Sequence, residues 1–95
     1  MITSKQRAHL RSLANPMPTI FQIGKGGINE NLIKQLDDAL EARELIKIHV
    51  LETSFLEPRA TLSELAEQLG AEPVQAIGGR IVMYRESKEN KTIEL

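Results

Sequence analysis

Residues 19–51 decide the fold, and they read TIFQIGKGGINENLIKQLDDALEARELIKIHVL. The opening residues 19–23 are rich in β-formers and end at Gly24, which predicts a first strand. Asn29 is a good N-cap, and apolar residues recur after it at the 3.6-residue period to about Ala42, which predicts a helix. These apolar residues are Leu32, Ile33, Leu36, Ala39 and Leu40. The stretch therefore predicts a strand, a glycine loop and a helix in succession.

Residues 45–51 alternate with period two, which predicts a second strand. The alternation separates an apolar face from a polar one: Ile46, Ile48 and Val50 against Lys47 and His49. A strand covered by helices on both sides would be apolar throughout. We therefore expect one face of the sheet to be partly solvated, with Lys47 and His49 on it.

A first helix is predicted before this stretch, from the capping box of Thr3 and Gln6 to Ala14. Asn15-Pro16 ends it, because a residue that precedes proline disfavours helical backbone. The helix has an apolar face and a basic face: Leu10, Leu13 and Ala14 on the first, and Lys5, Arg7, His9 and Arg11 on the second.

A third helix is predicted after the second strand. Residues 52–60 show no clear period, and we expect a loop in which Phe55 and Leu56 turn inward. Residues 61–64, Thr-Leu-Ser-Glu, form a second capping-box pattern. The helix that they begin is predicted to end at Gly70.

Two strands and a tail complete the chain. Residues 74–77 and 80–85 are predicted strands, and Gly78-Gly79 between them suits a two-residue hairpin turn. The final residues are charged, and we expect 87–95 to form a frayed or weakly docked tail.

The complete order is helix, strand, helix, strand, helix, strand, strand, in one domain over residues 1–95. We expect the α/β class in its α+β-like form, with two strand-helix-strand units of parallel strands and a final antiparallel hairpin. The result is a mixed four-stranded sheet with three helices. A chain of 95 residues with 41% hydrophobic content fits one globular core. Such a small core leaves little room for a deep substrate cavity.

Composition excludes several classes of protein. The chain has no cysteine, which removes disulfide scaffolds, thiolate metal sites and cysteine nucleophiles. No run approaches the roughly 18 apolar residues of a membrane span, and the first residues lack the pattern of a signal peptide. We expect a cytoplasmic protein that does not associate with membranes.

Charge is distributed unevenly along the chain, although the formal net charge is −1. Residues 1–36 carry five basic residues and one acidic residue, a balance of +4, whereas residues 37–95 carry seven basic and twelve acidic residues, a balance of −5. The first third is therefore a basic module. Such polarity can indicate an anionic partner, and it is also compatible with an ordinary mixed surface.

The glycine loop, Gly24-Lys25-Gly26-Gly27, is the most informative candidate site, because it joins a strand to the N-terminus of the best-predicted helix. Glycines allow the backbone to approach an anion, free N–H groups of the first helical turn point at it, and Lys25 adds positive charge. The spacing fits neither a Walker loop nor a dinucleotide fingerprint. Gly-x-x-Gly resembles the loop with which KH domains clamp nucleotide backbones. The alternative is a simple strand-to-helix turn.

The sequence gives weaker indications of metal binding, catalysis or base stacking. His9 and His49 lack the spacing of metal ligands, no serine lies in a nucleophile elbow, and we expect no metal and no cofactor. Acidic residues share one face of the central helix, and we expect a solvated surface there: Asp37, Glu41 and Glu44. The aromatic residues form no paired stacking motif: Phe21, Phe55 and Tyr84. If nucleic acid binds, phosphate contacts must supply most of the affinity.

Five segments, taken in order and spacing, resemble the CRM domain, the YhbY-like family of RNA-binding proteins. They are LRSLAN at 10–15, QIGKGGI at 22–28, RELIK at 43–47, VQAIG at 74–78 and VMYR at 82–85. The resemblance covers nearly the whole chain. It implies a sheet similar to that of the C-terminal domain of initiation factor three, which agrees with the order of elements derived above.

The resemblance also implies a function and a set of contact residues. It implies a protein that binds ribosomal RNA and associates with precursors of the large ribosomal subunit, with no catalytic activity and no small-molecule substrate. The implied RNA-binding residues are the glycine loop and a basic surface: Gly24, Lys25, Gly26 and Gly27, with Arg11, Lys34, Arg80 and Arg85. The local positive charge adds Arg7 to this surface.

Two other functions remain open at this point. One is a protein-interaction module, in which the acidic second half docks a partner and the glycine loop is only a turn. The other is an enzyme that binds a phosphate-bearing ligand in the loop, but the sequence offers it no convincing base or nucleophile.

Overall fold

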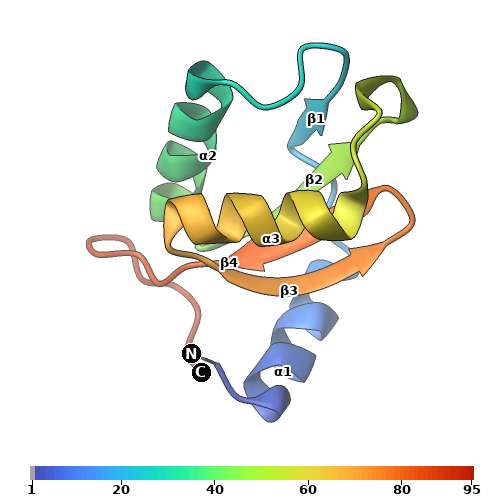
Figure 1. Cartoon of the computed structure of the whole chain (residues 1–95). Coiled ribbons are helices and arrows are strands. Elements are labelled where there is room, and N and C mark those ends of the chain that lie inside the picture. Colours follow the sequence, from blue (N-terminus) through green and yellow to red (C-terminus); the bar gives the residue numbers. More distant parts are fainter. Residues whose placement is uncertain (1) are drawn as a thin grey trace.

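The computed structural model describes residues 2–95 and has the predicted order of elements (Figure 1). They are α1 (Ser4–Ala14), β1 (Phe21–Ile23), α2 (Glu30–Arg43), β2 (Leu45–Val50), the 3-10 helix η1 (Glu52–Ser54), α3 (Pro58–Leu69), β3 (Glu72–Ile77) and β4 (Arg80–Tyr84). The predicted α+β-like class, with three helices and a mixed four-stranded sheet, is confirmed.

The strands are ordered β1-β2-β4-β3 in a single sheet. β1 and β2 are parallel, and β4 is antiparallel to both of its neighbours, β2 and β3. β2 and β3 therefore run in the same direction, as predicted, but β4 lies between them. β3 is an edge strand, which is why it tolerates Pro73, a residue without an N–H, and a bulge between Pro73 and Gln75.

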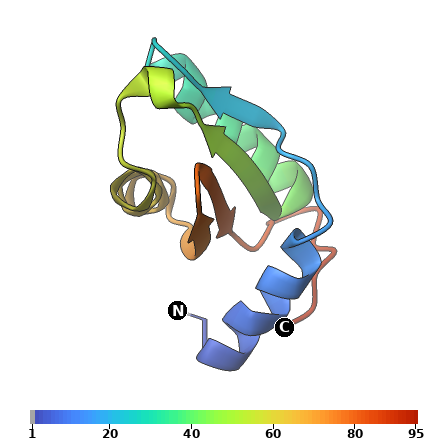
Figure 2. The same ribbon diagram turned by 90° about the vertical axis from the view of Figure 1, so that its right-hand side faces the viewer.

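The main core lies between one face of the sheet and the two helices α2 and α3 (Figures 1 and 2). Ile46, Ile48 and Val50 of β2 are buried there, whereas Lys47 and His49 are partly exposed on the opposite face. The predicted register of this strand is confirmed. Side chains of α2, α3 and the sheet fill the core, including Leu36, Leu40, Leu65, Ile81 and Met83.

A second, smaller core lies on the opposite face, where α1 covers part of the sheet. Leu10 and Ala14 of α1 are fully buried against Leu45, Val82 and Tyr84. Leu13, which was predicted to share their face, is 37% exposed. These contacts place α1 over the part of the sheet near Leu45, where β2 begins.

The first two helices begin where the sequence predicts. Thr3 and Gln6 form a reciprocal capping box: the Gln6 N–H donates to Thr3 Oγ1 at 3.1 Å, and the Thr3 N–H donates to Gln6 Oε1 at 2.9 Å. The Leu32 N–H donates to Asn29 Oδ1 at 2.8 Å, so Asn29 caps α2. Both caps satisfy helix-terminal amides that have no intrahelical acceptor.

The start of the third helix differs from the prediction. α3 begins at Pro58, and its N-cap is Glu57, whose Oε2 accepts the Ala60 N–H at 2.6 Å. Thr61, the predicted cap, lies buried inside the helix. Proline in the first helical position is preorganised for a helix, and here it takes precedence over the capping-box pattern three residues later. The predicted end at Gly70 is confirmed by its left-handed backbone, with φ of 64°.

The segment between β2 and α3 also differs from the prediction. Leu56 packs against the main core as predicted, but Phe55 does not turn inward, and 93% of its surface is exposed. Adjacent residues on this tight turn cannot both face the protein. Leu56 takes the inward position, and Phe55 faces solvent.

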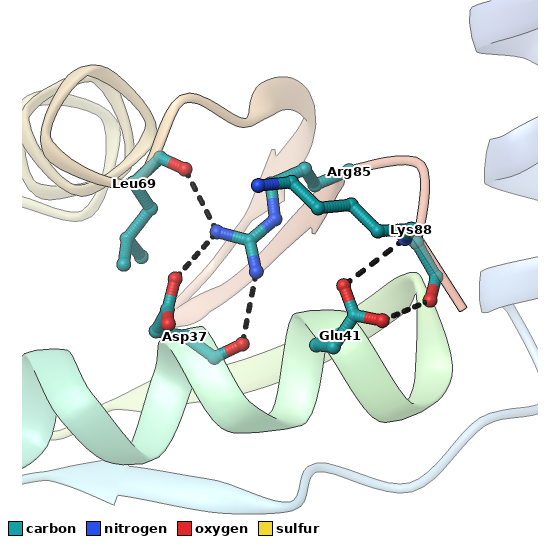
Figure 3. Close-up of polar contacts among 6 residues, drawn as sticks. Asp37, Glu41, Leu69, Arg85 and Lys88 are labelled. Carbon is teal, nitrogen blue, oxygen red and sulfur yellow. Dashed lines mark hydrogen bonds and ion pairs between the residues drawn. The ribbon is translucent and has the colours of Figure 1, made fainter. Parts of the chain in front are cut away.

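The acidic face of α2 is not the solvated surface that was predicted (Figure 3). Glu44 has no exposed surface, and its carboxylate accepts the N–H groups of Ser87, Thr92 and Ile93 at 2.7–2.8 Å. Burial raises the pKa of Glu44, but these hydrogen bonds together outweigh burial, and the pKa is lowered. The chain after β4 is therefore held by specific bonds, where a frayed or weakly docked tail was expected.

Glu41 makes a second set of contacts with the same segment. Its carboxylate accepts the Ser87 hydroxyl at 2.6 Å and the N–H groups of Lys88 and Glu89 at 3.1 Å (Figure 3). The Ser87 hydrogen bond, followed by the two backbone bonds, lowers the pKa of Glu41 from 4.5 to about 2. Both carboxylates lie more than forty residues from their donors in sequence, so no local pattern could indicate these contacts.

Both ends of the described chain lie beside the smaller core, at one end of the sheet (Figure 1). Ile2 and Ile93 both pack against the smaller core, and the Ile2 N–H donates to Glu72 Oε1 at 3.0 Å. Glu72 is aligned through Tyr84 with Leu45, the first residue of β2. The glycine loop follows β1 at the other end, where Ile23 is aligned with Val50, the last residue of β2.

Candidate nucleic-acid interface

The glycine loop is a tight turn between β1 and α2. The Gly27 N–H donates to the Gly24 carbonyl at 2.9 Å, and Gly27 has φ of 63°, a conformation that L side chains rarely adopt. Within residues 2–95, no hydrogen bond engages the backbone N–H of Lys25 or Gly26. A Cβ placed on Gly26 would meet no atom within 4 Å. The tip of the loop therefore presents free donors and open space to solvent.

Positive potential at the loop comes from Lys25 and from the helix that follows. Lys25 is exposed at the turn, and the loop leads through Asn29 into a helix of 14 residues. A helix of this length has a positive N-terminal end that favours anions. Glu30 occupies the first turn of α2 and offsets part of this charge. The arrangement suits a phosphate group that approaches from the side of Lys25.

The uncovered part of the sheet extends the candidate surface from the loop. Gln22, His49 and Arg80 are aligned across β1, β2 and β4, one residue inside the edge that carries the loop. Gln22 and Arg80 are exposed, and His49 is partly exposed. Lys47 lies further along the same face, where its Nζ donates to the Asn15 carbonyl at 3.4 Å.

The residues Gln22, Lys47 and His49 were not among the predicted contact residues. The period-two pattern of β2 indicated that Lys47 and His49 face solvent, but the residues beside them on neighbouring strands depend on strand pairing.

Gly79 constrains the packing of the β3–β4 turn, because a Cβ there would lie 2.8 Å from the Val50 carbonyl and 3.2 Å from the His49 ring. Only glycine allows the β3–β4 turn to lie this close to the end of β2.

The structure distributes the predicted basic residues over several parts of the surface. Arg80 lies on the uncovered sheet face near the loop, and Lys34 lies on α2, 3.8 Å from Asp38 in an exposed ion pair. An exposed pair of this kind contributes little and leaves Lys34 available. Arg7 and Arg11 lie on α1, and Arg7 Nε donates to the Pro73 carbonyl at 3.2 Å, near the far end of the sheet. The basic residues surround the sheet and do not form one compact patch.

Arg85 is engaged inside the fold (Figure 3). Its guanidinium donates to Asp37 Oδ1 at 2.6 Å, to the Asp37 carbonyl at 3.0 Å and to the Leu69 carbonyl at 3.0 Å. Its side chain is 21% exposed. These bonds join β4 to α2 and to the end of α3, so Arg85 has a structural role and offers few free donors to a ligand.

No group of three His, Asp or Glu side chains in residues 2–95 could hold a metal ion. Over the same residues, no helix has the length and apolar character needed to cross a membrane.

Comparisons with known proteins identify related chains. The CRS1 / YhbY (CRM) domain matches residues 2–85. The "Probable RNA-binding protein YqeI" of Bacillus subtilis is 50% identical over 95 residues, which is 100% of this chain and 99% of the relative. An "RNA-binding protein" of Haemophilus influenzae is 29% identical over 90 residues, with 95% of this chain and 91% of the relative covered.

A solved structure shows the same architecture. The solution structure of the hypothetical protein SAV1595 from Staphylococcus aureus superposes with a TM-score of 0.71 and 56% sequence identity. The match covers 100% of this chain and 99% of that chain. The family match over most of the chain, the full-length relative and the shared fold lead to one conclusion: this protein belongs to the CRS1 / YhbY (CRM) domain family.

Proposed function

We propose that this protein binds ribosomal RNA and assists assembly of the large ribosomal subunit in the cytoplasm, without catalysing a reaction. The observation that carries the proposal is the glycine loop, in which free N–H groups, an exposed lysine and a helix N-terminus converge. Relatives named as RNA-binding proteins support RNA as the ligand. The resemblance to the YhbY-like family directs the proposal to ribosomal RNA in large-subunit precursors.

The proposed contact surface is centred on the glycine loop and continues to cations on other parts of the surface. Its members are Gly24, Lys25, Gly26 and Gly27, with Arg80 on the uncovered sheet face, Lys34 on α2, Arg7 and Arg11 on α1 toward the far end of the sheet, and Arg85 as the least available. Backbone amides and lysine contact phosphate without distinguishing bases, so the loop contributes affinity and position. The choice of RNA segment then depends on how well the shape of the RNA fits the rest of the protein surface.

The protein-interaction alternative is less well supported by the geometry. It requires the acidic second half of the chain to receive a partner. Asp37, Glu41 and Glu44 already accept hydrogen bonds from Arg85 and from the segment after β4. The chain itself therefore occupies Glu41 and Glu44, and Asp37, whose side chain is 55% exposed, is paired with Arg85.

A salt titration of RNA affinity tests the loop directly. Lys25→Ala should weaken binding to different RNAs about equally and reduce the slope of log affinity against log salt by roughly 0.7 to 0.9, the value of one phosphate contact. Lys88→Ala is the matched control, since it removes the same charge from an exposed residue beside Glu41, far from the loop. Unchanged affinity and slope in folded Lys25→Ala would remove Lys25 from the site.

Sedimentation tests the biological part of the proposal. In gradients from growing cells at low salt, the protein should travel with particles smaller than the mature large subunit, and crosslinking should recover ribosomal RNA. Lys25→Ala should shift protein from these particles to the soluble fraction. Wild-type protein found only in the soluble fraction would refute the assembly role.

A further inference from the structure

Phe55 occupies a position that neither burial nor backbone preference explains. It is the one aromatic side chain in residues 2–95 that stands in solvent, since Tyr84 is buried and Phe21 packs against the main core. Its backbone is left-handed, with φ of 58°. This conformation is unfavourable for a bulky residue, and such strain persists only where surrounding structure enforces it.

The turn that carries Phe55 is ordered by its own hydrogen bonds. The Phe55 N–H donates to the Glu52 carbonyl at 3.0 Å. Ser54 Oγ donates to the Leu51 carbonyl at 2.7 Å and accepts the Leu56 N–H at 3.1 Å. Leu56, the next residue, is anchored in the main core. The ring of Phe55 is therefore presented from a fixed backbone, which reduces the entropy lost when a ligand binds.

This turn lies directly beside the glycine loop. The Leu51 N–H donates to the Ile23 carbonyl at 2.9 Å, which extends the β1–β2 pairing to the base of the loop. A Cβ placed on Gly24 would lie 3.6 Å from Leu51 Cδ1 and 3.8 Å from Thr53 Oγ1. Both views show η1 next to the loop that follows β1 (Figures 1 and 2). The exposed ring and the free amides of the loop thus share one edge of the molecule.

We propose that Phe55 is a stacking platform for an unpaired nucleobase of RNA whose phosphates are held by the glycine loop. The inference rests on the proposed RNA-binding function and adds a contact that favours unpaired over base-paired RNA. An aromatic face beside a cationic, phosphate-binding loop is the combination that binds single-stranded nucleic acid without reading its sequence. Within a duplex, the faces of the bases are covered by their neighbours and cannot reach Phe55.

Two substitutions separate stacking from a simple apolar contact. Phe55→Ala removes the side chain, and Phe55→Leu keeps an apolar side chain without an aromatic face. The probe is an unstructured single-stranded oligoribonucleotide of A and C residues, compared with its fully paired duplex. Both variants should lose about tenfold in affinity for the single strand, within the roughly 5- to 150-fold range of one base–aromatic stack, and lose little for the duplex. Thermal melts confirm that each variant is folded.

The salt dependence separates this inference from the proposed function. Phe55 is uncharged, so Phe55→Ala should lower affinity by the same factor at every salt concentration and leave the slope unchanged. Lys25→Ala should change the slope. If wild type binds with a Lys25-dependent slope and folded Phe55→Ala binds as well as wild type, the stacking role is refuted and the loop remains. If wild type shows no salt-dependent RNA binding, the proposed function itself fails.

Fluorescence gives an independent readout. The chain has no tryptophan, so Phe55→Trp introduces a single reporter. Stacking on a base should quench it when the single strand is added, and its affinity should equal or exceed that of wild type. Ser63→Trp, on the exposed side of α3, is the matched control and should not be quenched. Equal quenching of both reporters, or retained affinity in Phe55→Leu, would refute stacking at Phe55 and indicate a nonspecific or merely apolar contact.

Discussion

Replacing Glu44 with glutamine should destabilise the protein strongly, although it only exchanges one carboxylate oxygen for an NH₂ group. One carboxylate oxygen, Oε1, accepts the N–H groups of Thr92 and Ile93 and the Thr92 hydroxyl, and Oε2 accepts the Ser87 N–H at 2.7 Å. The best orientation of glutamine keeps its carbonyl at Oε1. Its NH₂ group then faces the Ser87 N–H, and two buried donors oppose each other.

The magnitude follows from these contacts. Leaving one buried donor unsatisfied costs about 1–3 kcal/mol, and the bonds that remain at Oε1 lose the charge that strengthens them. We expect Glu44→Gln to lower the free energy of unfolding by about 2–3 kcal/mol at pH 7. For a domain of this size that corresponds to a fall in Tm of roughly 10–20 °C. Glu67→Gln, which makes the same charge change on an exposed part of α3, should stay within about 0.5 kcal/mol of wild type.

The assay is thermal and denaturant unfolding between pH 7 and pH 3, with amide hydrogen exchange at Ser87 and Ile93. The folded pKa of Glu44 is lowered, so its stabilisation is fully present above the unfolded pKa and is lost as pH falls through the folded pKa. The difference between wild type and Glu44→Gln should therefore shrink at low pH. A difference below about 0.5 kcal/mol at pH 7, or one independent of pH, would refute the reasoning.

Three further outcomes are expected. The stability of wild type should fall between pH 4.5 and about 2 as Glu41 is protonated, because its folded pKa is depressed; flat Tm values across this range would contradict the role of Glu41. Gly27→Ala should lower Tm because φ is 63°, whereas Gly26→Ala should keep Tm and weaken RNA binding; melts paired with affinity measurements distinguish them. Gly79→Ala should cost about 1–3 kcal/mol, since the added Cβ would lie 2.8 Å from the Val50 carbonyl, and a neutral result by denaturant unfolding would argue against that close packing.

Local patterns predicted most of the fold. The cap at Asn29, the alternation of residues 45–51 and the hairpin glycines act through neighbours in sequence, and the structure confirms each. The start of α3 was wrong because two N-terminal patterns overlap, and Pro58 begins the helix before Thr61 can cap it. Periodicity alone could not rank these two starts.

The parts of the fold and the site that could not be predicted depend on contacts between segments distant in sequence. Glu44 was expected in solvent because its donors lie 43 to 49 residues away, and nothing near it in sequence identifies them. The candidate site divides in the same way. The glycine loop is contiguous and could be predicted from sequence, whereas the row of Gln22, His49 and Arg80 exists only through strand pairing. Phe55 was missed because a hydrophobic residue in a short loop is ordinarily expected to be buried.

The position of Ile2 and Ile93 has a practical consequence for tethering the molecule. Ile2 and Ile93 pack on the same small core at the start of β2, whereas the glycine loop lies beyond its end. A bead, a fluorophore or a fused domain attached through either terminus is therefore held on the side away from the loop. Immobilised protein should present the loop and Phe55 to dissolved RNA equally well whichever terminus carries the attachment.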